Sequence, residues 1–142
     1  MYIDSIKNGI VLDHIKAGRA MVIYNALSLD ELSCSVAVLK NVPSRKMGRK
    51  DMIKIDDDFE VNLDILGYID PGITVDIIRD GELVEKRSLT LPERIVGYLR
   101  CNNPRCITTT EQELPQIFTL SDRESGTYRC LYCESKVKDS LK

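Results

Sequence analysis

The last third of the sequence carries two close pairs of cysteines, and their spacing limits what this segment can fold into. Cys101 and Cys106 are separated by four residues, and Cys130 and Cys133 form a CxxC pair. Two close pairs joined by a long loop can supply the four thiolates of a tetrahedral zinc site, because each pair bends its backbone around the ion. Four sulfur ligands leave no open coordination position, so the pattern predicts one structural Zn²⁺ ion rather than a catalytic one.

The same cysteines also allow two disulfides or a redox-active CxxC pair. A thioredoxin-like motif begins a helix in a βαβ unit, whereas Cys130-Leu-Tyr-Cys133 lies in a polar segment with a partner pair upstream. The spacing and a reducing compartment favour zinc. The fifth cysteine, Cys34, stands beside Val36 and Val38 and is expected to be a buried thiol without a functional role.

The composition is that of an ordinary globular protein. Hydrophobic residues make up 43% of the 142 residues and charged residues 30%, and the net charge is −2. A pI of about 5.5 provides no general field that would attract nucleic acid or an anionic membrane. No apolar run reaches membrane-spanning length, and the N-terminus lacks the layout of a signal peptide. We therefore expect a cytoplasmic chain that has neither a membrane nor a nucleic acid as partner.

The segment before the cysteines reads as mixed α/β. Strands are expected where residues alternate or branched side chains dominate, and helices where apolar residues recur at helical intervals. The expected strands are 10–15, 33–42, 50–55, 73–78 and 82–87, and the expected helices are 20–29 and 61–69. The order β-α-β-β-α-β plus a final strand suggests the ferredoxin-like arrangement, in which helices cover one face of an antiparallel sheet.

Proline and glycine mark the ends of several of these elements. Pro43 is expected to close the second strand, because proline cannot donate to a sheet ladder. Pro71-Gly72 is expected to end the second helix. Asp80-Gly81, between the last two strands, predicts a tight hairpin.

The composition changes after Leu89, and Leu91-Pro-Glu-Arg-Ile95 reads as a junction. The remainder is polar, rich in turns and too small to fold without help, so a metal is physically expected. We expect an α+β protein with a ferredoxin-like βαββαβ sandwich in residues 1–92 and a small all-β zinc-ribbon (rubredoxin-like) domain in residues 93–142. The ribbon is nearly charge-balanced and has no basic stripe, which favours docking to another protein. A nucleic-acid-binding zinc ribbon and a small redox or nucleotide-processing enzyme remain alternatives.

Cationic side chains suggest a second site in the N-terminal part. In the strand 50–55 alternation places Lys50 and Lys54 on one face, and Lys86 lies on another strand. Cations from neighbouring strands can bind one polyphosphate. The alternative is that these lysines only solvate an exposed strand face.

Acidic and aromatic partners for such a ligand lie near the N-terminus. His14 is the only histidine and adjoins Asp13, and either Asp4 or Asp13 can accept a hydrogen bond from a base or a sugar. The sequence has no Walker loop and no dinucleotide fingerprint, so a phosphate-transferring active site is not expected.

Several motifs in order resemble a known family. They are Ile6-Lys7 with Gly9, Val11-Leu-Asp-His-Ile15, Pro43-Ser44, Met47-Gly-Arg-Lys-Asp51 running into Ile53-Lys-Ile55, Leu91-Pro-Glu-Arg-Ile95, the pair Cys101/Cys106 leading into Ile107-Thr108, and Cys130-x-Tyr-Cys133. Over nearly its whole length the chain resembles the regulatory chain of aspartate carbamoyltransferase.

This resemblance implies a non-catalytic subunit of an enzyme of pyrimidine biosynthesis. An N-terminal allosteric domain would bind nucleoside triphosphates, with CTP (often together with UTP) inhibiting and ATP activating. A C-terminal zinc domain would bind the catalytic chain, and regulatory dimers would bridge catalytic trimers.

The resemblance also implies a set of nucleotide-binding residues. Lys54 and Lys86 would contact the triphosphate with Lys50 close by, and Asp13 with its backbone would hold the ribose or base. The full set is Asp4, Ile6, Val11, Asp13, His14, Lys50, Met52, Lys54, Asp76, Ile78, Leu83 and Lys86.

The chain departs from the family pattern at several positions. Asp4 stands where a longer acidic residue is familiar, Asp76 where an asparagine is, and Gly81 where an aromatic residue is. An additional carboxylate beside a triphosphate is unfavourable unless a metal or a lysine compensates it. In the zinc domain Asn103 matches a position that meets the catalytic chain, and Arg105 replaces a polar neutral residue.

Overall fold

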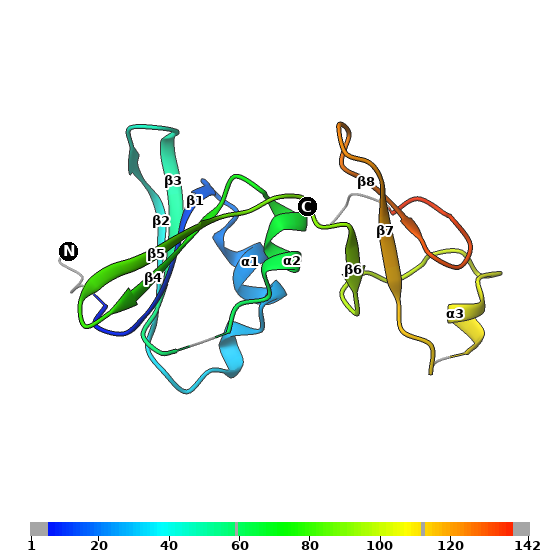
Figure 1. The fold of residues 1–142 in the computed structure, drawn as a ribbon, viewed down its shortest axis with the longest axis horizontal. Helices are drawn as coiled ribbons and strands as arrows, with labels where there is room; N and C mark the ends of the chain where they lie inside the picture. Colours follow the sequence, from blue (N-terminus) through cyan, green and yellow to red (C-terminus); the bar gives the residue numbers. More distant parts are fainter. Residues whose placement is uncertain (1–5, 59, 112, 138–142) are drawn as a thin grey trace. The chain divides into compact units, whose positions relative to one another are not determined.

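The computed structural model describes residues 6–58, 60–111 and 113–137. Its contacts divide the chain into two compact units, Met1–Thr90 and Leu91–Lys142 (Figure 1). We call them the N-terminal unit and the C-terminal unit.

Within the described residues, the N-terminal unit is built on one antiparallel sheet of five strands in the order β2-β3-β1-β4-β5, here called the large sheet. The strands are β1 Gly9–Lys16, β2 Val36–Ser44, β3 Gly48–Ile55, β4 Thr74–Arg79 and β5 Glu82–Ser88. The helices are α1 Ala20–Ala26, the short 3₁₀ helix η1 Leu29–Glu31, and α2 Leu63–Ile69. This is the ferredoxin-like βαββαβ order with β5 added beside β4, so the expected fold class of this part is confirmed.

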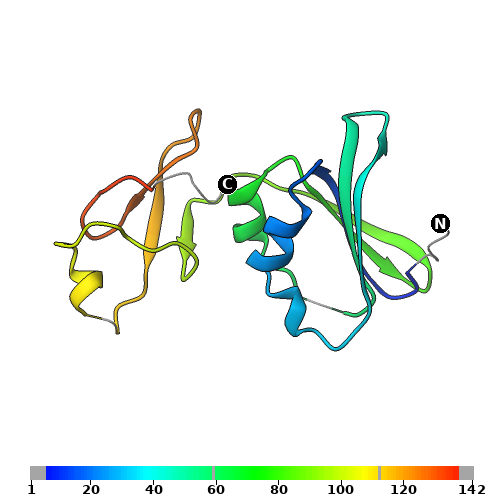
Figure 2. The same ribbon diagram turned by 180° about the vertical axis from the view of Figure 1, so that it is seen from behind.

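Both helices lie on one face of the large sheet, as both views show (Figures 1 and 2). Along β3 the side chains alternate as expected, with Ile53 and Ile55 fully buried and Lys54 half-buried. The hydrophobic core joins such strand residues to buried helix residues. Its members are Ile10, Leu12, Ile15, Ala20, Ile23, Leu29, Ile53, Ile55, Leu66, Tyr68, Ile69, Ile73 and Val75. The opposite face of the sheet, which carries Val11, Lys54 and Asp76, is here called the outer face.

The hairpin between β4 and β5 forms as expected. Asp80 and Gly81 both have positive φ angles, 52° and 77°, which is the backbone of a type I′ turn and suits an Asp-Gly pair. The turn is tied to the segment before β1, because the Gly81 amide donates to the Lys7 carbonyl at 2.8 Å and the Asp80 amide to Asn8 Oδ1 at 3.1 Å.

Several element boundaries differ from the expected ones. The first helix ends at Ala26, and Ser28 in a left-handed conformation separates it from η1. Cys34 is half-buried rather than buried, because it lies in a bend before β2 begins at Val36. Pro43 does not close β2, which continues to Ser44 with Pro43 opposite Arg49. Since β2 is an edge strand, the missing proline N–H can face away from the sheet.

Two β-bulges shape the strands beside β3, and the sequence pattern did not indicate them. The register shifts between Leu12 and Ile15 in β1 and between Leu39 and Val42 in β2. His14 and Asn41, inside these shifts, have φ angles of 60° and 57°. Such bulges redirect side chains out of the regular alternation.

A buried carboxylate stabilises the bulge of β2. Asp51 is fully buried, and its oxygens accept hydrogen bonds from the amides of Gly18 at 2.9 Å, Ala20 at 3.0 Å and Asn41 at 2.8 Å. One side chain therefore fixes the bulge of β2 and the start of α1, which are otherwise separate in the sequence.

The C-terminal unit is built on a small antiparallel sheet in the order β6-β7-β8. Its strands are β6 Arg94–Val96, β7 Ile117–Asp122 and β8 Thr127–Cys130, and a single helical turn forms α3 Ile107–Thr110. The buried apolar residues Ile95, Leu99, Phe118 and Tyr128 form its core, and the Tyr128 hydroxyl donates to the Pro92 carbonyl at 2.5 Å. This small sheet unit agrees with the expected zinc ribbon.

In the part of the chain that the structure describes, no helix has both the length and the apolar character needed to cross a membrane.

Candidate metal centre and outer face

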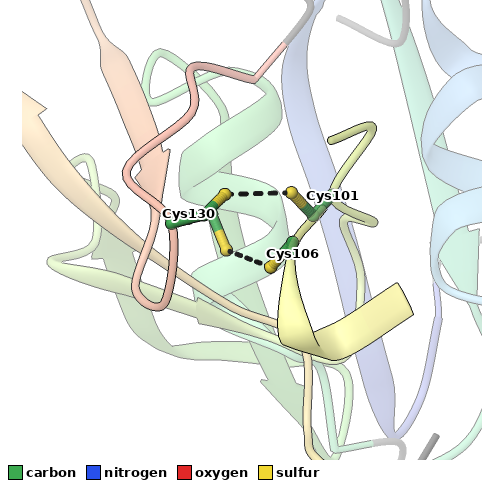
Figure 3. Close-up of side chains that lie close together, drawn as sticks. Cys101, Cys106 and Cys130 are labelled. Atoms are coloured by element: carbon green, nitrogen blue, oxygen red, sulfur yellow. Dashed lines mark hydrogen bonds between the residues drawn. The ribbon is translucent and has the colours of Figure 1, made fainter. Parts of the chain in front are cut away.

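The side chains of Cys101, Cys106, Cys130 and Cys133 converge in the C-terminal unit, with all four sulfurs within 4.8 Å of one another. The Sγ atoms of Cys101 and Cys133 are 3.4 Å apart, and those of Cys106 and Cys130 are 3.7 Å apart. Figure 3 shows Cys101, Cys106 and Cys130 pointing toward a common centre. A disulfide requires about 2.05 Å between sulfurs, so the geometry is that of separate thiols, and the disulfide alternative does not describe it.

The cluster has the dimensions of a four-thiolate zinc site. Zn–S bonds of about 2.3 Å in a tetrahedron place the sulfurs about 3.8 Å apart, close to the measured 3.4 Å and 3.7 Å. Cys106 and Cys130 are buried, and Cys101 and Cys133 are half-buried. The cluster therefore fits one structural zinc ion that has no open coordination position.

Local hydrogen bonds shape the two cysteine turns. In the first turn the Cys106 amide donates to the Asn103 carbonyl at 3.0 Å, and the Arg105 amide donates to Asn103 Oδ1 at 3.0 Å. In the second the Glu134 amide donates to the Cys130 carbonyl at 2.9 Å, with Glu134 at a φ of 65°. Both turns curve the backbone around the sulfurs, as metal-binding turns must.

Burial and local hydrogen bonds shift the pKa values of the thiols in opposite directions. Burial, together with hydrogen bonds to the other sulfurs, raises the pKa of Cys101 to about 12, and burial also raises the pKa of Cys130. Hydrogen bonds from the side chain and backbone of Ser135 lower the pKa of Cys133 to about 6. Several thiolates this close repel one another, so a bound cation is what would allow all of them to ionise.

On the outer face of the large sheet, strand register aligns residues from four strands. Val11 in β1 lies opposite Lys54 in β3 and also opposite Asp76 in β4, and Asp76 in turn lies opposite Lys86 in β5. Residues paired in this way share one face of a sheet. The row Lys54–Val11–Asp76–Lys86 therefore brings together residues that are far apart in the sequence.

A second group lies beside this row, at the β1 bulge. Lys50 Nζ lies 2.8 Å from Asp13 Oδ1 in a largely buried ion pair, and the His14 amide donates to the same oxygen at 2.6 Å. His14 Nδ1 lies 2.9 Å from the Thr74 hydroxyl. Burial alone would raise the pKa of Asp13, but the Lys50 and His14 hydrogen bonds outweigh burial and lower the pKa.

Asp76 has a different environment. Among the described residues, its Oδ1 is a buried side-chain atom with no hydrogen-bond partner. Burial raises the pKa of Asp76, and the nearby Lys86 only partly opposes that effect. The outer face thus holds one carboxylate that is neutralised by a lysine and one that is not.

The remaining predicted nucleotide-binding residues lie around these two groups. Met52 faces the β1 bulge from β3, and Ile78 and Leu83 are opposite one another in β4 and β5. Ile6 packs against Gly9, where an added Cβ would come within 2.8 Å of Ile6 Cγ2. Asp4 lies outside the described residues.

Comparison with known proteins assigns both units. Residues 1–90 match the family model described as the allosteric domain of the aspartate carbamoyltransferase regulatory chain. Residues 93–140 match the family model described as the metal-binding domain of the same chain. The chain belongs to the aspartate carbamoyltransferase regulatory chain family. The resemblance expected from the sequence is thereby confirmed.

Regulatory chains of this family from several bacteria are similar over almost their whole length. The regulatory chain of Clostridium botulinum (strain Hall) is 48% identical over 132 residues, which cover 93% of this chain and 90% of the relative. That of Clostridium tetani is 46% identical over 137 residues, covering 96% and 95%. That of Bifidobacterium longum is 43% identical over 138 residues, covering 97% and 99%. Membership in a family of regulatory chains supports a non-catalytic subunit.

Several residues at the two sites were not anticipated from the sequence. The Thr108 hydroxyl lies 3.1 Å from Cys106 Sγ, and the Ser135 hydroxyl lies 3.3 Å from Cys133 Sγ. Both are two residues from a cysteine, a spacing that gives polar side chains access to a ligand sulfur. Thr74 contacts His14 across the sheet, and only the strand register reveals that contact.

Proposed function

We propose that this chain binds nucleoside triphosphates on the outer face of the large sheet and passes their effect to the catalytic chain of aspartate carbamoyltransferase. The row Lys54–Val11–Asp76–Lys86 carries the proposal. Neighbouring strands are about 4.8 Å apart, so the backbones of the two lysines are about 14 Å apart, and their long side chains can reach one triphosphate that lies across the row. The half-buried Val11, Met52 and Ile78 offer apolar surface for a base or sugar.

The Asp13–Lys50 pair would position the nucleoside. Asp13 is held by Lys50 and by the His14 amide, so its second oxygen can accept from a ribose hydroxyl or a base amino group. His14, in turn, is fixed by Thr74. Asp4, one of the twelve predicted residues, lies outside the described residues. Its part in nucleotide binding is therefore proposed from the family resemblance alone.

Titration of the purified zinc-loaded chain with ATP and CTP tests this site. Lys54→Ala and Lys86→Ala should each weaken binding at least tenfold, because a charge-assisted hydrogen bond to phosphate is lost. Lys46→Ala, an exposed lysine in the turn between β2 and β3, is the matched control and should bind as wild type does. Equal affinities for all four proteins would refute the assignment.

The regulatory effect would be a shift of population. A nucleotide that binds one global state of the holoenzyme more tightly than another biases the equilibrium by that difference in affinity. CTP, with UTP, would inhibit and ATP would activate, which places the chain in the control of pyrimidine biosynthesis. Steady-state kinetics of the reconstituted holoenzyme with each nucleotide tests these roles. An aspartate saturation curve that none of the three nucleotides changes would contradict these roles.

Exposed apolar side chains beside the cysteines support a docking role for the C-terminal unit. Ile107, directly after Cys106, is 51% exposed, and Leu131 and Tyr132, between Cys130 and Cys133, are 41% and 37% exposed. A pocket of about 610 Å³ also opens beside Cys101. With all four cysteines bound to one zinc ion, these side chains would be held rigidly. Rigid apolar groups are what a protein partner recognises. The partner would be the catalytic chain.

Docking is tested by co-purification with the catalytic chain. Leu131→Asp should weaken the complex at least tenfold while zinc content stays at one per chain, because a charge enters an apolar contact. Val96→Asp, at an exposed apolar residue on β6 (57%), is the matched control and should leave the complex intact. A Leu131→Asp chain that still binds the catalytic subunit with wild-type affinity would exclude this surface.

A dimer of regulatory chains would pair the large sheets. The sheet ends in the edge strands β2 and β5, and an edge strand offers unpaired backbone groups to a second copy. Light scattering on the isolated chain should give a dimer. Ala37→Pro on β2 and Val84→Pro on β5 test the two edges, and one of them should yield a monomer. A dimer that survives both changes would place the interface elsewhere.

A further inference from the structure

Asp76 lies between the two lysines that would hold the triphosphate. Its register partners are Val11 in β1 and Lys86 in β5, and Val11 in turn faces Lys54 in β3. A polyphosphate that contacts Lys54 and Lys86 at once must therefore pass over the Asp76 side chain.

The charges around Asp76 come from three other strands of the large sheet. Asp13 and His14 face it from β1, Lys50 from β3 and Lys86 from β5. Lys50 is already paired with Asp13, so its charge is largely cancelled. If Asp76 is ionised it offsets Lys86 in the same way, which leaves Lys54 as the main uncompensated cation of the row. The net electrostatic attraction between such a face and a polyanion would be weak.

A proton on Asp76 changes this balance in two respects. It removes the negative charge beside the phosphates, and it converts the carboxylate from an acceptor into a hydrogen-bond donor. The buried Oδ1, which has no partner among the described residues, then belongs to a neutral group and carries no charge that a cation would have to balance. A phosphate oxygen can accept the new O–H group.

Resting on the proposed nucleotide site, we propose that Asp76 couples polyphosphate binding to the uptake of one proton. The proton comes from solvent, bonds to the Asp76 carboxylate, and is shared with a phosphate oxygen of the ligand. The chain would therefore bind nucleoside triphosphates more tightly as pH falls.

The expected size of the effect follows from linkage. Burial raises the pKa of Asp76 in the free chain, and a bound polyanion raises this pKa further. Between the free and bound pKa values, the affinity should rise up to about tenfold for each unit of pH lowered. Asp76→Asn lacks the titrating group and keeps the size of the side chain, so it should lose this part of the pH dependence and bind more tightly than wild type above neutral pH.

Calorimetric titration of the full zinc-loaded chain with ATP tests the proposal. Measurements in buffers of different ionisation enthalpy report proton uptake directly, and wild type should take up as much as one proton more than Asp76→Asn. The γ-phosphate of ATP also takes up a proton near neutral pH, but the same ligand is used with each protein, so this contribution cancels in the comparison. Asp30→Asn, an exposed carboxylate in η1, is the matched control and should behave as wild type.

Each outcome has a distinct meaning. Equal proton uptake and equal pH slopes for wild type and Asp76→Asn, with binding intact, would overturn the role of Asp76 and leave the nucleotide site standing. Wild-type binding that requires Mg²⁺ and takes up no proton would also overturn it, because a divalent cation would then neutralise the carboxylate. Failure of both proteins to bind ATP at any pH, with normal circular dichroism, would overturn the nucleotide site and this inference together.

Discussion

The N-terminal unit and the C-terminal unit bury different kinds of side chain. The first packs aliphatic residues of β1, β3 and β4 beneath two helices, with Leu12, Ile53 and Leu66 fully buried. The second has a short sheet, and two cysteines, Cys106 and Cys130, belong to its buried interior. A unit of about fifty residues buries too little apolar surface to be stable without a further contribution. In the C-terminal unit the zinc ion supplies that contribution.

This difference separates the two proposed roles. Apolar packing tolerates small adjustments in the outer face when a ligand binds, whereas four metal–sulfur bonds fix their surroundings rigidly. A nucleotide sensor suits the first kind of unit and a docking module suits the second. The predictions below test whether the two units really depend on different interactions.

Removal of zinc should produce the largest effect, and only in the C-terminal unit. Structural zinc contributes about 10–16 kcal/mol of binding free energy in small domains, and that binding is coupled to folding. After chelation, or in Cys130→Ser, the amide signals of the C-terminal unit in a ¹⁵N–¹H spectrum should collapse to unfolded positions. Signals of the N-terminal unit should keep their dispersion, and the complex with the catalytic chain should dissociate.

Cys34→Ser is the control for this experiment, because Cys34 lies outside the cluster. It should keep both units folded and retain one zinc ion. Persistence of dispersed signals from residues 94–130 in the metal-free chain would show that the small sheet folds on its own, and the contrast between the units would then be wrong.

A cavity in the N-terminal core should have the reciprocal effect. Leu12→Ala removes a fully buried side chain and should destabilise the N-terminal unit by about 2–5 kcal/mol. The C-terminal unit should still bind one zinc ion. Urea denaturation followed by the amide signals of the N-terminal unit and by zinc release measures the two units separately. Leu83→Ala, at a residue 55% exposed in β5, is the control and should change stability little; loss of zinc in Leu12→Ala would show that the units fold as one.

Most of the fold could be predicted because it rests on local patterns. The alternation in β3 and the Asp80-Gly81 hairpin were read directly from the sequence, since a period of two and a type I′ turn are short-range signals. The predicted helix 20–29 is longer than the observed helix α1, which ends at Ala26. Ser28 adopts a left-handed conformation that periodicity does not reveal. The prediction that Pro43 closes the second strand was wrong, because an edge strand can accommodate a proline whose missing N–H faces away from the sheet. Whether a strand lies at the edge depends on the tertiary structure.

The two sites differ in how far the sequence predicted them. The spacing of the cysteines was sufficient to predict the cluster, because two short turns each bring two sulfurs together. The outer-face row depended on register across four strands, and the Asp13–Lys50 pair depended on a bulge at His14 that no pattern indicates. The state of Asp76 follows from burial in the folded sheet, and sequence spacing carries no information about it.

The next largest effect is expected at Asp51, which distinguishes polar from apolar stabilisation within the N-terminal unit. Asp51→Ala removes the acceptor of three backbone amides and leaves these donors unpaired, so stability should fall by about 2–3 kcal/mol. Thermal unfolding of the N-terminal unit measures this change. Asp57→Ala is the control, since Asp57 is exposed and its carboxylate accepts from the adjacent Asp58 amide. If Asp51→Ala melts at the wild-type temperature, the bulge of β2 does not depend on this side chain.

The smallest expected effects distinguish the two carboxylates of the outer face. The pKa of Asp13 is lowered, so its stabilising contribution is full above the unfolded value of about 3.9 and is lost as pH falls through the folded pKa. The pKa of Asp76 is raised, so its ionised form destabilises the folded unit above the folded pKa, and that cost disappears as pH falls through this value. At neutral pH, Asp13→Asn should therefore lower the stability of the N-terminal unit by about 1 kcal/mol, and Asp76→Asn should raise it by about as much. Thermal unfolding at a series of pH values measures both changes, and the C-terminal unit should respond to neither. Changes of the same sign in the two variants would mean that Asp13 and Asp76 share one electrostatic environment, and the contrast between the paired and the unpaired carboxylate would have to be abandoned.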